Sequence, residues 1–198
     1  IGVATVIAVS PDLLQQLPAD LDPSLRALIQ AAPAVAREKL SEAGLQAYVQ
    51  GLIKLRTHGA AWAPLVAYLR QVPLVVEILD ASIIQPLIET ALRVSERAGT
   101  APLDQFFATS TLAARKLGDT LAFLEYLRLV SETSAVSPAV LPLLFDRLPT
   151  LLDGLTIGGL RRWVQVGLRT HSRDADAQKK YFALDSKDAI AMLKLGGE

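Results

Sequence analysis

An internal repeat with a period near 40 residues constrains the fold of this chain more than any other feature. Four leucines with similar neighbours, Leu52, Leu92, Leu129 and Leu168, lie 40, 37 and 39 residues apart in a chain of 198 residues. A period of about 40 built from two helices is typical of HEAT-like solenoids. The spacing therefore predicts a helical repeat array, an α-solenoid, in which antiparallel helix pairs stack in sequence order.

The repeat extends to aromatic and glycine positions, which apolar periodicity alone would not match. Residues 44–52 resemble residues 159–168 with one residue inserted. The matching positions are Tyr48 with Trp163, Gly51 with Gly167, and Tyr68 with Phe106 and Tyr181. We expect these aromatic residues in corresponding buried positions. The alternative is an irregular helical bundle, because amphipathic helices resemble one another when they are aligned.

Helix signals dominate the chain. A capping residue followed by proline predicts helix starts at Ser10-Pro11, Asp22-Pro23 and Ser137-Pro138. Apolar residues then recur at intervals of three and four residues, which indicates amphipathic helices. The apolar stripes are Leu45, Tyr48, Val49, Leu52 and Leu55; Leu160, Trp163, Val164, Gly167 and Leu168; and Leu121, Phe123, Leu124, Leu127 and Val130. In the third stripe, Glu125, Arg128 and Glu132 are left for the solvent side.

The pattern predicts an all-α protein of ten or so helices. The 11 prolines indicate short helices, or helices kinked at Pro73 and Pro86. Residues 1–9 are the only segment that could form a strand. We find no linker, and so expect a single helical-repeat domain over residues 1–198. Because the chain opens on Ile1 and stops just after a helical pattern, we expect it to be a piece of a longer protein.

Composition excludes several classes of function. Lys plus Arg and Asp plus Glu number 20 each, which argues against a nucleic-acid-binding domain. Hydrophobic residues make up 51% of the chain, but its two longest stretches without a charge are 13 residues each, too short for a membrane span. The absence of Cys excludes disulfides, thiolate catalysis and Cys-ligated metals. Without Cys or an export signal, we expect a cytoplasmic protein.

No motif predicts a catalytic, cofactor-binding or metal-binding residue. His58 and His171 both follow helices, where an imidazole stabilises the last carbonyls. Asp80, Ser82 and Ile84 match the Asp-x-Ser-x-Ser metal motif only in part and within a helical pattern, so we interpret them as a chance match. Phosphate loops, nucleophile elbows and paired acidic residues are also missing. The sequence therefore favours a protein that is not an enzyme.

The last helices are basic. The candidate partner-binding residues are Arg161, Arg162, Arg169 and Arg173, followed by Lys179 and Lys180. Arg162 and Arg169 are seven residues apart and therefore share a helix face, opposite the apolar stripe of Trp163. Two interpretations stay open, a solvated face or a surface for an acidic partner. We expect both tryptophans, Trp62 and Trp163, in the core.

The C-terminal third resembles a known family. The segment 159–168, followed by an Asp/Ala-rich turn and by the segment 181–186, is similar to the helical N-terminal region of the NorD/CbbO family. Proteins of this family carry a von Willebrand factor A domain after the helical region and work beside a hexameric MoxR-type AAA+ ATPase. The resemblance covers residues 155–195, and more generally 40–130 through the repeats. The metal-binding A domain is missing from this chain, so its metal site has no counterpart here.

The resemblance implies a protein-binding adaptor that docks on the ATPase and helps to activate a target enzyme. Rubisco activation is slightly preferred over activation of nitric oxide reductase. The alternative is a helical domain that binds a small ligand in an apolar cavity. A cavity of several hundred Å³ lined by aromatic residues would favour the ligand-binding domain, and a closed core with a groove would favour the adaptor.

Overall fold

The computed structural model of the chain describes residues 23–30, 40–170 and 174–195. These residues fold into helices and contain no strand. The α-helices are α2 (Pro23–Gln30), α4 (Glu42–Thr57), α5 (Trp62–Ile78), α6 (Ile84–Ala98), α7 (Leu103–Leu117), α8 (Thr120–Val136), α9 (Leu141–Gly154), α10 (Ile157–Thr170), α11 (Ala175–Phe182) and α12 (Ser186–Leu195). Two 3-10 helices, η1 (Ala81–Ile83) and η2 (Pro138–Val140), lead into α6 and α9. The candidate strand at residues 1–9 and the predicted helix start at Ser10-Pro11 lie outside the described residues.

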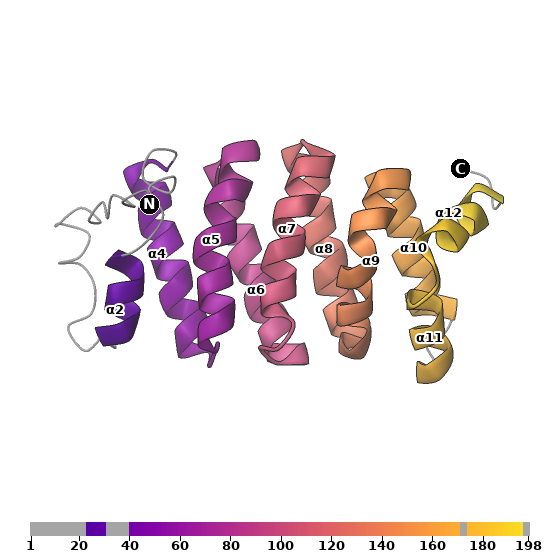
Figure 1. Cartoon of the computed structure of the whole chain (residues 1–198), viewed down its shortest axis with the longest axis horizontal. Coiled ribbons are helices and arrows are strands. Elements are labelled where there is room, and N and C mark those ends of the chain that lie inside the picture. The colour runs from indigo at the N-terminus through magenta and orange to yellow at the C-terminus, as the bar shows by residue number, and fades with distance from the viewer. Residues whose placement is uncertain (1–22, 31–39, 171–173, 196–198) are drawn as a thin grey trace, which may run out of the picture.

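The helices form two layers. In one layer α4 packs on α6, α6 on α8 and α8 on α10; in the other α5 packs on α7, and α7 on α9. Figure 1 shows the pairs following one another along the long axis of the molecule. Each helix thus packs on the one two places along the chain, as in a solenoid of helix pairs. The prediction of an all-α, HEAT-like array is confirmed.

The four leucines that define the period all lie in the first layer. Leu52, Leu129 and Leu168 are buried on α4, α8 and α10, and Leu92 is half-buried on α6. Of the aromatic residues predicted to correspond, Tyr48 and Trp163 lie on α4 and α10 of the first layer, and Tyr68, Phe106 and Tyr181 lie on α5, α7 and α11. All five are buried, as predicted.

A capping side chain begins each helical segment of the first layer, at α4, α8 and α10 directly and at η1 ahead of α6. In all four cases its oxygen accepts a hydrogen bond of 2.7–3.2 Å from a backbone N–H two or three residues further along. The caps are Ser41, Asp80, Asp119 and Thr156, so successive caps are 39, 39 and 37 residues apart. These bonds satisfy N–H groups that a helix start leaves open. The caps therefore set the register of the repeats.

Glycine ends the first-layer helix in the first two pairs. Gly59 follows α4 with φ 83°, and Gly99 follows α6 with φ 77°. This left-handed region favours glycine, which has no Cβ to clash with the backbone. Gly59 and Gly99 are 40 residues apart, so the first two turns within a pair use the same chemistry. The third turn uses Ser137 and Pro138.

The third turn departs from the prediction in one respect. Pro138 begins η2 as expected, but the Ser137 side chain makes no cap. Its hydroxyl donates instead to Gln178 Oε1 at 2.5 Å, which ties this turn to α11. Pro73 lies inside α5, whereas Pro86 lies in the first turn of α6, where proline leaves the helix intact. The predicted kink at Pro86 is therefore wrong.

The first and last helix pairs share an aromatic clasp. Tyr48 stacks on Tyr68 at 5.2 Å between ring centroids, and Trp163 stacks on Tyr181 at 5.5 Å. The Tyr68 hydroxyl donates to the Tyr48 carbonyl at 2.7 Å, and the Tyr181 hydroxyl donates to the Trp163 carbonyl at 3.0 Å. All four rings are buried. The predicted correspondence of Tyr48 with Trp163, and of Tyr68 with Tyr181, is confirmed.

A glycine makes room for each clasp. A Cβ on Gly51 would lie 2.5 Å from the Tyr68 hydroxyl, and a Cβ on Gly167 would lie 2.6 Å from Tyr181 Cδ1. Both distances are shorter than real Cβ contacts, so any larger residue would displace the tyrosine. The matching glycines in the sequence therefore mark the closest approach of the two layers.

Hydrogen bonds and ion pairs made by side chains, two of them to backbone carbonyls, join neighbouring pairs at intervals of one repeat. Their partners are 36–41 residues apart in sequence. Examples are Arg93 with Ser131, Gln105 with Asp146, Thr120 with Asp80, Lys116 with Asp153, and Thr150 with Ser186. Aromatic contacts follow the same interval, from Tyr68 to Phe107 and from Phe106 to Phe145. Phe106 is buried, as predicted.

The stripe predicted on α8 is partly wrong. Phe123, Leu127 and Val130 are buried, but Leu121 is 76% exposed. Leu121 precedes Glu125, Arg128 and Glu132 by four, seven and eleven residues, so it shares their outward face of α8 and lies opposite the buried residues. Glu125, expected in solvent, has a side chain only 16% exposed because it forms ion pairs with its neighbours.

No helix in the described part of the chain is long and apolar enough to cross a membrane. The buried apolar residues of the described helices form one hydrophobic core that runs through both layers.

Candidate functional site

The basic residues of α10 are the first candidate site. Arg162 and Arg169 are exposed, whereas Leu160, Trp163 and Val164 on the opposite side of the helix are buried. The predicted separation of these two faces is confirmed. Val166, which is 39% exposed, lies between the two arginines in sequence. The outward face of α10 thus combines two cations with one exposed aliphatic residue.

Arg161 differs from its neighbours because it is held by the fold. Its Nε lies 2.5 Å from Glu125 Oε1 on α8. Glu125 also pairs with Arg128 at 3.4 Å, and Arg128 pairs with Glu132 at 3.3 Å. This ion-pair network links α8 to α10, so Arg161 supports the packing of neighbouring repeats. Arg173, the fourth predicted residue, lies outside the described residues.

A shallow depression lies beside Arg162. It has a volume of about 330 Å³ and is lined by Thr156, Gly158, Gly159 and Arg162 at the start of α10. Thr156 caps the helix by accepting the Gly159 N–H at 3.2 Å. The two glycines leave the backbone of this turn uncovered beside the arginine. The depression is open to solvent and gives a partner access to Arg162.

A second depression lies between two turns on one edge of the array. It measures about 400 Å³ and lies between the α6–α7 turn and the start of α9. Its polar residues are Arg97 and Gln105, and its walls are the alanines and prolines Ala98, Ala101, Pro102, Pro138, Ala139 and Pro142. No aromatic residue lines it. It is open to solvent, unlike the enclosed aromatic cavity expected of a ligand-binding domain.

Acidic residues and histidines take structural positions in the described part of the chain. No group of three or more His, Cys, Asp or Glu residues there could hold a metal ion. His58 follows α4 as predicted, and its Nδ1 donates to the Lys54 carbonyl at 2.8 Å. His171 lies outside the described residues. Asp80 caps η1, and hydrogen bonds from Ser82, together with one from Thr120, lower the pKa of its carboxyl.

The buried hydroxyls also take structural positions. Burial raises the pKa of Tyr126 and of Tyr181 to about 12, and also raises the pKa of Tyr48 and of Tyr68. Three of these hydroxyls donate to backbone carbonyls, and that of Tyr126 lies 3.3 Å from Thr109 Oγ1. A phenol with a raised pKa and a bonded hydroxyl is a poor proton acceptor at neutral pH.

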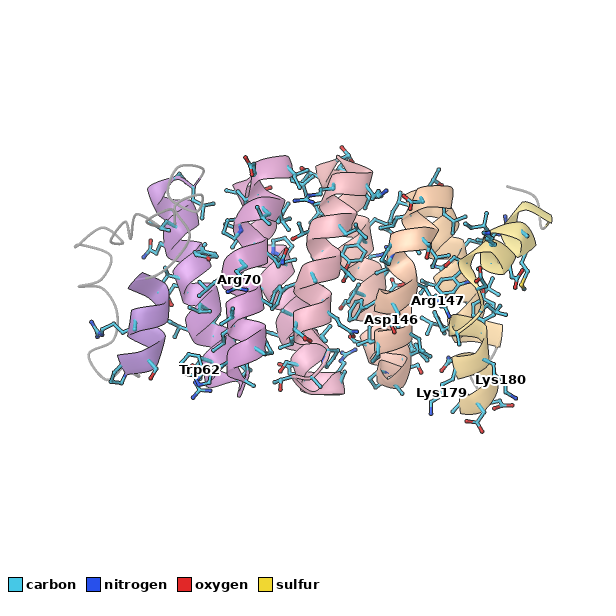
Figure 2. The ribbon with its side chains drawn as sticks, in the orientation of Figure 1. Trp62, Arg70, Asp146, Arg147, Lys179 and Lys180 are labelled. Atoms are coloured by element: carbon cyan, nitrogen blue, oxygen red, sulfur yellow. The ribbon has the colours of Figure 1, made fainter. Side chains whose placement is uncertain are left out.

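The structure corrects the prediction for Trp62. This residue begins α5 and is 39% exposed, whereas Trp163 is 1% exposed and in the core as predicted. The Arg56 guanidinium lies over the Trp62 ring at 5.0 Å from its centroid. Trp62 is exposed because the first residue of α5 extends beyond the edge of the core. Figure 2 shows it at one end of α5, with Arg70 further along the same helix.

Comparison of the chain with protein-family models, with curated proteins and with solved structures finds no match.

Proposed function

We propose that this chain is a non-enzymatic adaptor domain that binds other proteins along its outer surface. The observation that carries the proposal is the closed core of the array, combined with charged and aromatic residues presented outward. A solenoid offers an extended surface with positions at regular intervals, which suits binding of a large partner. Arg162 and Arg169 on α10 and Trp62 on α5 are the residues best placed for such contacts.

The geometry supports an adaptor over a small-ligand domain. The largest aromatic residues of the core fill its interior against one another, at 5.0–6.1 Å between ring centroids. The 400 Å³ depression is open and lined by alanine and proline. Pockets for small molecules are usually concave, enclosed and rich in aromatic residues.

For the partner, the proposal extends the resemblance to the NorD/CbbO family. We propose that the chain docks on a hexameric MoxR-type AAA+ ATPase and holds a target-recognising domain near it. ATP-driven motion of the ring would then reach a target enzyme, with Rubisco activation preferred over nitric oxide reductase activation. In this proposal Arg162 and Arg169 contact acidic residues of the ATPase.

The test measures binding of the purified chain to a MoxR-type hexamer in the presence of ATP, with biolayer interferometry as the readout. The variant is the double charge reversal Arg162→Glu with Arg169→Glu. Wrong-sign contacts at an interface slow association and are costly, so we expect affinity to fall severalfold or more. Both residues are exposed, so we expect the melting temperature to be nearly unchanged.

A matched control reverses two other exposed cations, Arg97→Glu with Lys187→Glu, and so makes the same change in net charge. The control separates a local contact from the effect of total charge. Absence of hexamer binding by the wild-type chain would refute the MoxR proposal. Equal loss in both double variants would refute the specific role of α10.

A further inference from the structure

Trp62 is the tryptophan that the fold leaves exposed to solvent. The chain has two tryptophans, and Trp163 is almost fully buried. Trp62 lies at the first position of α5, with 39% of its surface exposed. Tryptophan and arginine are enriched among the residues that dominate binding energy at protein interfaces.

Arg56 holds the Trp62 ring in place. Its guanidinium lies 5.0 Å from the ring centroid, and its Nη1 donates to the Ala60 carbonyl at 3.2 Å. The guanidinium is therefore fixed at the end of α4 and covers one face of the indole. A side chain that is already ordered loses less entropy when a partner binds. The pair is thus preorganised for contact.

Trp62 begins a ridge along the outer surface of α5. Val66, Arg70 and Leu74 follow it at intervals of four residues, which places the four side chains in one row of the helix. The row is about 18 Å long at 1.5 Å per residue. Arg70 is exposed, and Val66 and Leu74 are half-buried. Figure 2 shows Trp62 and Arg70 along α5.

The neighbouring helix of the same layer extends this apolar surface. On α7, Ala108 is exposed and Leu112 is half-buried, four residues apart. The exposed charges of α7 around them, Asp104 and Arg115, have opposite signs. The surface formed by α5 and α7 therefore joins apolar side chains to cations that α5 and the end of α4 supply.

The charge of this region identifies the partner. Between Glu42 and Glu77 the sequence contains no acidic residue over 34 positions, while Lys54, Arg56 and Arg70 are present. Residues 43–76 therefore carry three positive charges and no negative charge, whereas α4 and α5 as whole helices also include Glu42 and Glu77 at their two ends and have a net charge of +1. Interfaces pair such patches with the opposite charge, which speeds association and selects the partner.

We propose that the row Trp62, Val66, Arg70 and Leu74, with Arg56, is a docking site for an acidic segment of a partner protein. The segment carries an apolar or aromatic residue that packs against the exposed part of the Trp62 ring. Its carboxylates lie over Arg56 and Arg70. The proposal rests on the protein-binding function proposed above, but on none of the α10 arginines.

The test uses a random 16-residue peptide library displayed on phage and the full 198-residue chain as bait. We expect the selected peptides to be rich in Asp and Glu and to contain an apolar anchor. Synthetic copies are then titrated against the chain. We expect affinity to fall tenfold or more for Trp62→Ala and for Arg56→Glu with Arg70→Glu. The control Arg162→Glu with Arg169→Glu should bind these peptides as the wild type does.

Acrylamide quenching of tryptophan emission gives a second readout. Trp62 is accessible to the quencher and Trp163 is not, so a bound peptide should protect the emission of the wild-type chain. Melting curves of the variants show whether the fold is kept. The proposal is overturned if no peptide is enriched over an empty bait, or if the selected peptides bind Trp62→Ala as tightly as the wild type. Loss of ATPase binding with peptide binding retained would overturn only the MoxR proposal.

Discussion

Substitution of Gly167 by alanine tests the close approach between the two layers in the last helix pair. A Cβ at this position would lie 2.6 and 2.7 Å from Cδ1 and Cε1 of Tyr181, and 2.8 Å from Cε2 of Phe182. The shortest of these is about 0.8 Å below the start of ordinary van der Waals contact. The atoms belong to buried rings that pack on Trp163, so they cannot turn away as the end of a flexible chain would.

The expected magnitude follows from three contributions. Overpacking a close-packed core costs about 1–3 kcal/mol. Displacement of the Tyr181 ring also weakens the hydrogen bond from its hydroxyl to the Trp163 carbonyl, worth about 1 kcal/mol. Replacing glycine by alanine inside a helix returns about 1 kcal/mol. We therefore expect Gly167→Ala to destabilise the chain by about 1–3 kcal/mol.

Gly158→Ala is the matched control in the same helix. The nearest atom to its Cβ would be Thr156 Oγ1 at 3.7 Å, an ordinary contact, and the position is exposed. This control should stabilise the chain by up to about 1 kcal/mol. Urea unfolding is followed by circular dichroism, and by Trp163 emission in a Trp62→Phe background, which reports on the last pair. If Gly167→Ala has the same urea midpoint as the parent chain, or a higher one, the close approach is refuted.

Four further predictions follow from the same geometry. Gly51→Ala should also destabilise, because its Cβ would lie 2.2 Å from Ile88 Cδ1 and 2.5 Å from the Tyr68 hydroxyl, both of which are buried; an unchanged midpoint in the same urea titration would contradict this. Trp163→Ala should cost about 3–5 kcal/mol, and an unchanged melting curve would exclude a core position for this ring. Calorimetric titration with ATP–Mg²⁺ and with Zn²⁺ should reveal no stoichiometric site, and a micromolar ATP site would contradict a non-enzymatic role. Burial raises the pKa of Tyr126 and of Tyr181 to about 12 in the folded chain, against about 10 in the unfolded chain. The free energy of unfolding should therefore be unaffected by these two groups below pH 10 and fall by about 1.4 kcal/mol per pH unit for each between pH 10 and 12. Phenolate absorbance that rises near pH 10 before unfolding would contradict this.

The repeat was predictable because burial at regular intervals leaves a periodic pattern. Leu52, Leu129 and Leu168 face one core, and the aromatic clasps need a glycine opposite a tyrosine. The prediction for Leu121 was wrong because an apolar residue type outweighed its spacing: Leu121 lies seven residues before Arg128 and so shares the solvent face of α8. Spacing, and not residue type, identifies the face of a helix that is buried.

The capping residues carry a second signal for the repeats in the sequence. The caps Ser41, Asp80, Asp119 and Thr156 are spaced as regularly as the leucines. They differ in identity, so a comparison of identical residues does not find them. They share the chemistry of a short side-chain oxygen that accepts a backbone N–H. Capping residues at intervals of 37–39 therefore mark the starts of α4, α8 and α10, and of η1 ahead of α6.

The candidate site was less predictable, because it depends on contacts between distant residues. The sequence placed Arg161 with Arg162, yet Glu125, 36 residues earlier, holds Arg161 against α8. Trp62 was assigned to the core on residue type alone. Two features could have indicated otherwise: its position at the start of a helix after Ala61, and the absence of acidic residues around it from 43 to 76. Neither feature by itself predicts that the first residue of α5 extends beyond the core.

The two proposed contact surfaces lie in different parts of the array. Trp62 belongs to the first described helix pair and Arg162 to the last complete one, with two helix pairs between them (Figure 1). In a solenoid each repeat contacts only its neighbours, so a change in one end pair has no direct path to the other. Sites without shared partners affect stability additively. Partner affinity that falls with changes at both ends therefore indicates a partner that contacts both surfaces of the array.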